Sequence, residues 1–175
     1  MSTYQHQPIT SVPEFLAHAL ELEVESGERY RMLADSMEIH NNTEVADLFS
    51  KMAHYSDLHA QEVAQRAAAF NLPAIAPWSF KWSCPDTPEA PCMEEANYLM
   101  TTAQALRLAL HNEIRGRDFY AHVSAITPDP EVSRLAREMA DEEQEHVVLL
   151  EIWVAQVAPQ NEEPLEDLDP PNITE

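Results

Sequence analysis

The sequence predicts an all-α fold, a four-helix bundle with one long crossover, and three observations lead to it. Strong helix formers such as Ala, Leu, Glu, Met and Gln are abundant, only 2 glycines occur in 175 residues, and no segment shows the alternation of a strand. Four segments space their apolar residues alternately three and four apart, as helix faces in a bundle do. The proline-rich stretch 71–91 can run the length of such a bundle, because an extended chain spans up to about 3.3 Å per residue.

The first two expected helices are joined by a short turn. Ser11 and Glu14 form a capping-box pattern with a proline between them, so a helix is predicted over 12–39. The polar segment 40–43 ends it, and a second helix is predicted from there to about residue 70. A short connection makes the second helix antiparallel to the first.

The last two helices follow the crossover between helices two and three. The third is predicted over about 93–125. After a tight turn, Asp129 is the expected N-cap of a fourth helix, with Pro130 at its first position and its end near Val157. Three aromatic residues of the crossover are expected to attach it to the outside of the bundle: Trp78, Phe80 and Trp82.

This organisation predicts one bundle domain over 12–157, with an N-terminal arm over 1–11 and a tail over 158–175. The tail is acidic, contains several prolines and is poor in apolar residues. Such a composition cannot bury enough apolar surface to fold, so we expect the tail to be disordered.

Charge and cysteine content exclude several classes of function. The net charge of −21 argues against a nucleic-acid partner and against an acidic membrane surface, and it favours cations as small partners. The first residues form no signal peptide and no run of about 18 apolar residues occurs, so a cytoplasmic protein without membrane segments is expected. Cys84 and Cys92 are too few and too far apart for a thiolate metal site, and we expect two reduced thiols.

The most informative feature is a pair of polar residues within the apolar stripe of the fourth helix. Glu143 and His146 lie three residues apart where the stripe otherwise carries apolar side chains. An ionised carboxylate buried without a partner is very unfavourable, so Glu143 must be paired, protonated or bound to a metal. Residues three apart project side by side, as a shared metal ion requires, but the pair could also simply hydrogen-bond.

The inner faces of the other helices also carry polar residues near their midpoints. Three carboxylates and two imidazoles in all match the oxygen and nitrogen ligands that iron(II), manganese(II) and zinc prefer. The predicted metal ligands are Glu23, His59, Glu113, Glu143 and His146. The histidines off these faces are expected at the surface: His18, His40, His54, His111 and His122.

Two tyrosines follow the glutamates of the first and third helices at the same spacing. Tyr30 comes seven residues after Glu23, and Tyr120 comes seven residues after Glu113. Seven residues are two helical turns, so each tyrosine shares a face with its glutamate and could reach a metal-bound carboxylate through its hydroxyl. Filling the core is the alternative role of both tyrosines.

With these motifs on one four-helix pattern, residues 12–157 resemble the ferritin-like superfamily, and most closely the helical domain of the rubrerythrins. The resemblance implies that Glu23 and Glu113 are terminal ligands and that Glu143 bridges two metal ions. It also implies a homodimer. The candidate catalytic residues are then Glu143, Tyr30 and Tyr120.

The chain departs from the rubrerythrin pattern at three points. Ser56 stands where a second bridging glutamate is expected, Gly116 stands where rubrerythrins carry an additional glutamate, and no rubredoxin-like module is evident. With one bridge, two ions could bind, or one tightly and one weakly. Because Asp57 points about 100° away from the Ser56 position, it is not expected to replace the missing carboxylate.

The function implied by this resemblance is a non-haem iron oxidoreductase that oxidises iron(II) while reducing peroxide or dioxygen, with an electron donor of unknown identity. Manganese or zinc could replace iron. The alternative is an iron-binding or iron-delivery module whose weakened site has no turnover. A further alternative is a degenerate bundle that serves only as a scaffold for protein interactions.

Overall fold

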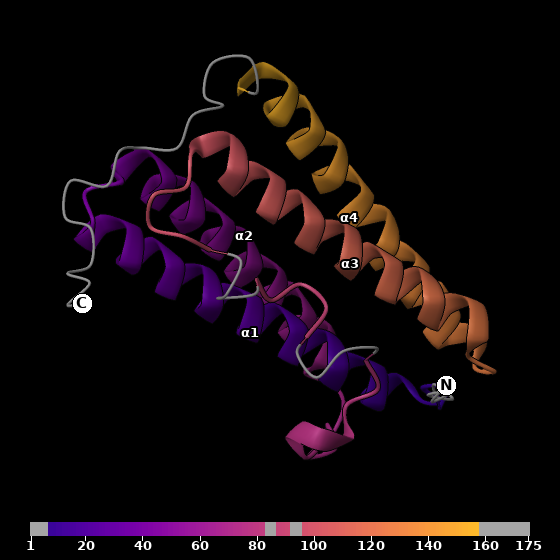
Figure 1. Cartoon of the computed structure of the whole chain (residues 1–175). Coiled ribbons are helices and arrows are strands. Elements are labelled where there is room, and N and C mark those ends of the chain that lie inside the picture. Colours follow the sequence, from indigo (N-terminus) through magenta and orange to yellow (C-terminus); the bar gives the residue numbers. More distant parts are fainter. Residues whose placement is uncertain (1–6, 83–86, 92–95, 158–175) are drawn as a thin grey trace, which may run out of the picture.

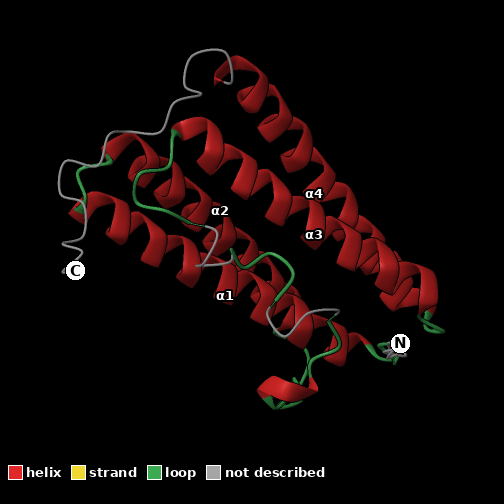
Figure 2. Cartoon of the chain, viewed as in Figure 1, coloured by secondary structure: helices red, strands yellow, loops and turns green. Residues whose placement is uncertain are grey.

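The computed structural model describes residues 7–82, 87–91 and 96–157. Within these residues it is a bundle of α-helices without strands, and a long crossover joins the second helix to the third (Figures 1 and 2). The predicted all-α four-helix bundle with a crossover is therefore confirmed.

The acidic tail, most of the arm and both cysteines lie outside the described residues. The helices are α1 (Val12–Ile39), α2 (Thr43–Ala67), the short 3₁₀ helix η1 (Pro77–Ser79), α3 (Thr102–Ile126) and α4 (Pro130–Val157).

The four long helices pack as two antiparallel pairs. Most contacts between helices join α1 to α2 and α3 to α4, and fewer join α2 to α3 and α1 to α4. Because the crossover returns the chain to the other end of the bundle, α3 runs parallel to α2 (Figure 1). The middles of all four helices are thereby brought to the same level.

The predicted ends of α1 and α4 agree with the structure because local capping residues define them. The Ser11 hydroxyl accepts a hydrogen bond from the Glu14 amide at the start of α1. After α1 the chain reverses at Asn41, whose φ of 59° is the left-handed conformation that Asn tolerates. Asp129 caps α4 by accepting from the amides of the second and third residues after it.

The predicted start of α3 near residue 93 is wrong, and α2 ends at Ala67 rather than near residue 70. Residues 96–101 are not helical although their composition favours a helix. The Asn42 side chain donates to the carbonyls of Tyr98 (3.2 Å) and Met100 (2.8 Å), which holds this segment against the α1–α2 turn. The helix then begins at a capping box in which Thr101 and Gln104 each accept from the other's backbone amide.

The crossover packs on α1 through a histidine that was expected at the surface. His18 is only 1% exposed, which contradicts that expectation. Its Nδ1 donates to the Glu14 carbonyl, and its Nε2 accepts from the Lys81 amide. Phe80 and Trp82 lie edge-on to the His18 ring, so these two aromatics do attach the crossover to the bundle, whereas Trp78 is 87% exposed and does not.

The apolar core consists of two clusters, one toward each end of the bundle. One cluster contains Tyr30, Met37, Phe49, Leu106 and Leu150, and the other contains Phe15, Leu22, Val63, Tyr120 and Met139. On every long helix the two clusters leave a gap near the midpoint, and most buried residues in that gap are polar or glycine, with Val147 on α4 an apolar exception. The bundle therefore encloses a polar layer between two apolar layers.

Among the described residues, no helix combines the length and apolar character needed to cross a membrane.

Candidate metal centre

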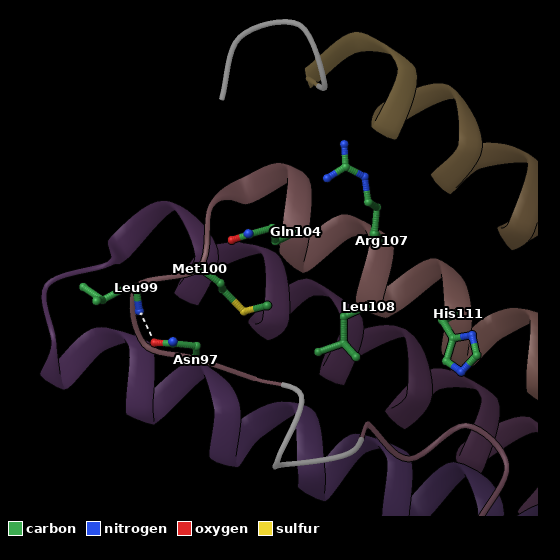
Figure 3. Close-up of a pocket in the computed structure, with 7 residues that line it drawn as sticks. All are labelled: Asn97, Leu99, Met100, Gln104, Arg107, Leu108 and His111. Atoms are coloured by element: carbon green, nitrogen blue, oxygen red, sulfur yellow. Dashed lines mark hydrogen bonds between the residues drawn. The ribbon is translucent and has the colours of Figure 1, made fainter. Parts of the chain in front are cut away.

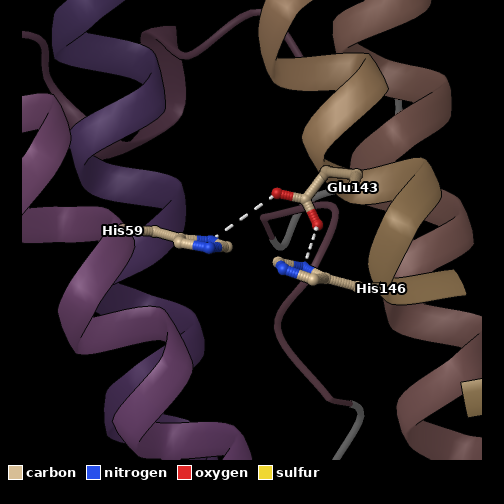
Figure 4. Close-up of side chains that lie close together, drawn as sticks. All are labelled: His59, Glu143 and His146. Carbon is tan, nitrogen blue, oxygen red and sulfur yellow. Dashed lines mark hydrogen bonds and ion pairs between the residues drawn. The ribbon is translucent and has the colours of Figure 1, made fainter. Parts of the chain in front are cut away.

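Glu143 lies at the centre of the polar layer and faces two histidines from different helices (Figure 4). Its Oε1 is 3.8 Å from Nδ1 of His59 on α2, and its Oε2 is 3.2 Å from Nδ1 of His146. The imidazole rings of His59 and His146 are stacked, with centroids 4.7 Å apart and an angle of 11° between their planes. One carboxylate thus has each of its oxygens directed at a different imidazole.

The other two predicted carboxylates lie on opposite sides of this group. Oε2 of Glu23 on α1 is 3.6 Å from Nδ1 of His59, and Oε2 of Glu113 on α3 is 3.2 Å from Nδ1 of His146. The structure therefore brings together all five residues that the sequence singled out. Each imidazole faces one outer carboxylate together with Glu143.

Burial makes this cluster electrostatically unusual. Glu23 and Glu143 are almost completely buried. Burial raises the pKa of Glu23 to about 7, and the neighbouring Glu143 charge acts in the same direction. Burial likewise raises the pKa of Glu143 to about 7, with the Glu113 charge adding to it. Burial lowers the pKa of His146, but the carboxylates of Glu113 and Glu143 outweigh it and raise this pKa to about 10.

The residues present fit one or more divalent cations. Oε2 of Glu23 is buried without a hydrogen-bond partner in the part of the chain that the structure describes, because 3.6 Å from His59 is too long for a hydrogen bond. Carboxylate oxygens and imidazole nitrogens are suitable ligands for iron, manganese and zinc. Two groups of three residues have potential ligand atoms within 4.8 Å of one another, and they share Glu143: His59 with Glu143 and His146, and Glu23 with Glu89 and Glu143.

Glu89 is the member of this cluster that the sequence did not reveal. It comes from the crossover and is 3% exposed, and its Oε1 is buried without a hydrogen-bond partner among the residues that the structure describes. Burial raises its pKa well above the usual value, and the charges of Glu143, Glu23 and Glu113 add to this. A residue in an irregular proline-rich segment has no helical periodicity to mark it, and the only related feature of the sequence is Gly116, where the rubrerythrin pattern has a glutamate.

Ser56 lies beside this cluster of glutamates and histidines, as its position in the sequence predicted. It is buried, and its hydroxyl donates to Ser26 on α1 (3.1 Å). Asp57 points elsewhere and forms an ion pair with Arg31, whose Nη1 donates to both carboxylate oxygens at 2.8 and 2.9 Å. Asp57 therefore does not supply the carboxylate that Ser56 lacks.

The two tyrosines are fully buried next to the cluster. The Tyr30 hydroxyl accepts a hydrogen bond from Asn112 on α3 (3.2 Å), whereas the Tyr120 hydroxyl has no hydrogen-bond partner within the described residues. Burial raises the pKa of both phenols well above the usual value. The next largest cause is the negative charge of Glu113 for Tyr30 and of Glu23 for Tyr120, which raises the pKa further. Both rings belong to the apolar clusters, so each tyrosine at least fills the core.

A narrow cavity reaches the cluster between α2 and α4. Its volume is about 20 Å³, enough for one water-sized molecule, and Tyr55, Ser56, Leu149 and Trp153 form part of its wall. A wider and more open pocket of about 450 Å³ lies near the start of α3 (Figure 3). It is lined by Asn97, Leu99, Met100, Gln104, Arg107, Leu108 and His111, which include no carboxylate, so the small cavity is the one suited to a metal centre.

Comparison with known proteins agrees with this geometry. The family model described as Rubrerythrin matches residues 14–78 and 104–171. The chain belongs to the rubrerythrin family. The matched segments contain α1 with α2 and α3 with α4, so the helices that carry Glu23, His59, Glu113, Glu143 and His146 are those of this family of ferritin-like di-iron carboxylate proteins.

A solved structure is also similar to this chain. It is the crystal structure of an uncharacterized conserved protein from Magnetospirillum magnetotacticum MS-1, with 45% sequence identity and a TM-score of 0.65. The match covers 83% of this chain and 95% of that one. No curated protein matches the chain. Membership in the rubrerythrin family makes metal ions plausible partners of this chain. It does not by itself establish which reaction the chain catalyses.

Proposed function

We propose that this protein is a non-haem iron oxidoreductase that oxidises iron(II) while reducing peroxide or dioxygen. The observation that supports it best is the position of Glu143, whose two oxygens face His59 and His146 separately. A carboxylate placed in this way is suited to bridge two cations, each held by one imidazole. The proposed ligands are the five predicted residues, and the proposed metal is iron.

The side chains of this site would each have a defined role. Glu23 with His59 would hold one ion, Glu113 with His146 the other, and Glu143 would face both. Two iron(II) ions held there would supply two electrons, enough with two protons to reduce one hydrogen peroxide to two waters or one dioxygen to hydrogen peroxide. The narrow cavity beside Ser56 would admit these small oxidants and exclude larger molecules. An electron donor outside this chain returns two electrons for sustained turnover.

Anaerobic addition of iron(II), followed by oxygen or peroxide, tests the proposal. We expect bound iron(II) to be oxidised faster than free iron(II), and Glu143→Gln to abolish the acceleration. Glu145→Gln is the matched control, because it removes a carboxylate from an exposed position of the same helix. If iron(II) binds no better to the protein than to the Glu143→Gln variant, or is oxidised no faster than in buffer, the proposal is wrong.

A second candidate function, iron binding and delivery without turnover, is favoured by one specific observation. Ser56 provides a neutral hydroxyl beside His59 where a second bridging carboxylate would bind both ions. A site with less negative charge holds cations less tightly. Rapid transfer of bound iron to a chelator, without consumption of peroxide, would support delivery, and slow transfer with continued turnover would exclude it.

A further inference from the structure

Gly116 on α3 is the residue that makes room for the crossover at the metal cluster. A Cβ atom at this position would lie 2.0 Å from Oε1 of Glu89, 2.4 Å from its Cγ and 2.6 Å from its Cδ. Nonbonded atoms do not approach so closely. Any other residue at position 116 would therefore displace the Glu89 side chain.

A carboxylate oxygen of Glu89 lies close to oxygens of two proposed ligands, Glu23 and Glu143. One oxygen from each of Glu23, Glu89 and Glu143 lies within 4.8 Å of the others, and all three residues are buried. The neighbouring imidazoles already face other carboxylates, His59 facing Glu23 and His146 facing Glu113. Oε1 of Glu89 is buried without a hydrogen-bond partner among the described residues, and Glu89 lies in a cluster of carboxylates. A bound cation is the partner that this geometry lacks.

The charges in the layer support the same interpretation. Four buried glutamates surround the two imidazoles: Glu23, Glu89, Glu113 and Glu143. When ionised they carry four negative charges, which two divalent cations would neutralise. With Glu89 absent, one positive charge would be left uncompensated in a buried site, at a high cost in desolvation.

We propose that Glu89 is a metal ligand supplied by the crossover, and that Gly116 is the space that admits it. The proposal rests on the iron site proposed above and adds a ligand that does not come from the four helices. On α3, position 116 shares a face with Glu113, three residues earlier, so a carboxylate from the crossover takes the place that a side chain of α3 would otherwise occupy. Metal binding then also holds the crossover against the bundle.

Anaerobic iron(II) titration in competition with a chromogenic chelator tests this inference, without any measurement of turnover. We expect Glu89→Gln to weaken the binding of one iron by at least about tenfold, the lower end of what losing an outer-shell partner costs at metal sites. Gly116→Ala should weaken it similarly, because the added methyl group displaces a carboxylate that is still present in the chain. Glu145→Gln, at an exposed position, should leave iron affinity unchanged.

Two further measurements separate a ligand from a structural residue. The metal-free Glu89→Gln variant should unfold at the same temperature as the wild type or higher, because a neutral amide replaces a carboxyl group crowded by other carboxylates. The double variant Glu89→Ala/Gly116→Glu should recover iron affinity, since removing the side chain beyond Cβ at position 89 clears the space over position 116 and the new glutamate projects from α3 beside Glu113.

The outcomes distinguish this inference from the proposed function. Wild-type affinity for both irons in Glu89→Gln, or a metal-free variant that loses stability while its iron affinity is unchanged, would overturn the role of Glu89 alone. A wild-type protein that binds no iron would overturn the proposed function and this inference with it.

Discussion

Ser56 shows how one residue sets the charge of the proposed metal site within the fold of the family. It occupies the inner face of α2 one turn before His59, and its hydroxyl is used in a hydrogen bond to Ser26. A serine cannot bridge cations as a carboxylate does, because it is shorter and neutral. The ion beside His59 should therefore be the weaker of the two.

Replacing Ser56 by glutamate is predicted to strengthen the binding of this ion. Ser56→Glu adds a carboxylate beside the small cavity and should tighten the weaker iron, while lowering metal-free stability because the new carboxylate is buried among like charges and the Ser26 hydrogen bond is lost. Anaerobic iron(II) titration measures both affinities. Ser50→Glu, at an exposed position of α2, controls for added charge. Unchanged affinities in Ser56→Glu would place Ser56 outside the site.

His18 illustrates a residue whose environment determines its charge. Both ring nitrogens are used by the backbone, and the Nε2 that accepts from Lys81 must be unprotonated to do so. Burial lowers the pKa of His18, and the charge of Lys81 lowers it further against the opposing effect of Glu14. The folded protein therefore binds a proton at His18 less readily than the unfolded chain.

This lowered pKa predicts a loss of stability in acid. Above about pH 6.5, the usual pKa of histidine, His18 is neutral in both the folded and the unfolded protein. Its contribution to the free energy of unfolding is then fully present. As the pH falls below this value the unfolded chain takes up the proton first, so the free energy of unfolding decreases until the folded pKa is passed. Urea unfolding of wild type and His18→Gln between pH 7.5 and 5 measures the difference. Parallel pH profiles would contradict the prediction.

At the scale of elements, the position of the crossover depends on side chains of the helices it passes. Its first part packs on α1 through His18, Glu89 lies against α3 at Gly116, and its last residues bond to Asn42. Asn42 is the N-cap of α2, yet its side chain makes no cap hydrogen bond, and its amide nitrogen donates to the crossover. A capping residue is thereby used for a tertiary contact.

Removing this contact should weaken the attachment of the crossover. Asn42→Ala removes both hydrogen bonds to the carbonyls of Tyr98 and Met100 and should lower the free energy of unfolding by about 1–3 kcal/mol. Urea denaturation measures the loss. Asn71→Ala, at an exposed position of the crossover, should change stability by less than about 0.5 kcal/mol. Similar values for the two variants would show that Asn42 does not hold this segment.

At the scale of the whole molecule, the polar layer separates two apolar clusters and joins all four long helices. Each helix contributes at least one residue to it, and the crossover contributes Glu89. Crowded buried carboxylates destabilise the metal-free protein, and cations that bind between them should stabilise it.

Metal binding is predicted to raise the stability of the whole bundle. Anaerobic iron(II) at about 100 times its dissociation constant should raise the free energy of unfolding by about 2.7 kcal/mol. The double variant Glu23→Gln/Glu143→Gln should lose this effect while remaining folded without metal, because it exchanges two buried carboxyl groups for amides. Magnesium serves as the control for a net charge of −21. Equal stabilisation by magnesium would attribute the effect to the acidic surface.

The sequence alone was sufficient for the four helices and for the five residues of the predicted cluster, because both follow from helical periodicity. Glu23, Glu113 and Glu143 interrupt apolar stripes, and a stripe's inner face is set by spacing along one chain segment. The caps at Ser11 and Asp129 are likewise local, since a side chain bonds to amides within three residues. Helix faces and local caps can therefore be predicted before any tertiary contact is known.

The tertiary structure alone decided the burial of His18, the late start of α3 and the presence of Glu89 in the cluster. In each case a residue without helical periodicity contacts a helix distant in sequence: Lys81 bonds to His18, Tyr98 bonds to Asn42, and Glu89 enters the space over Gly116. The path of an irregular segment depends on the surface that the helices form after packing. Its contacts are therefore not encoded in the local pattern that predicts the helices themselves.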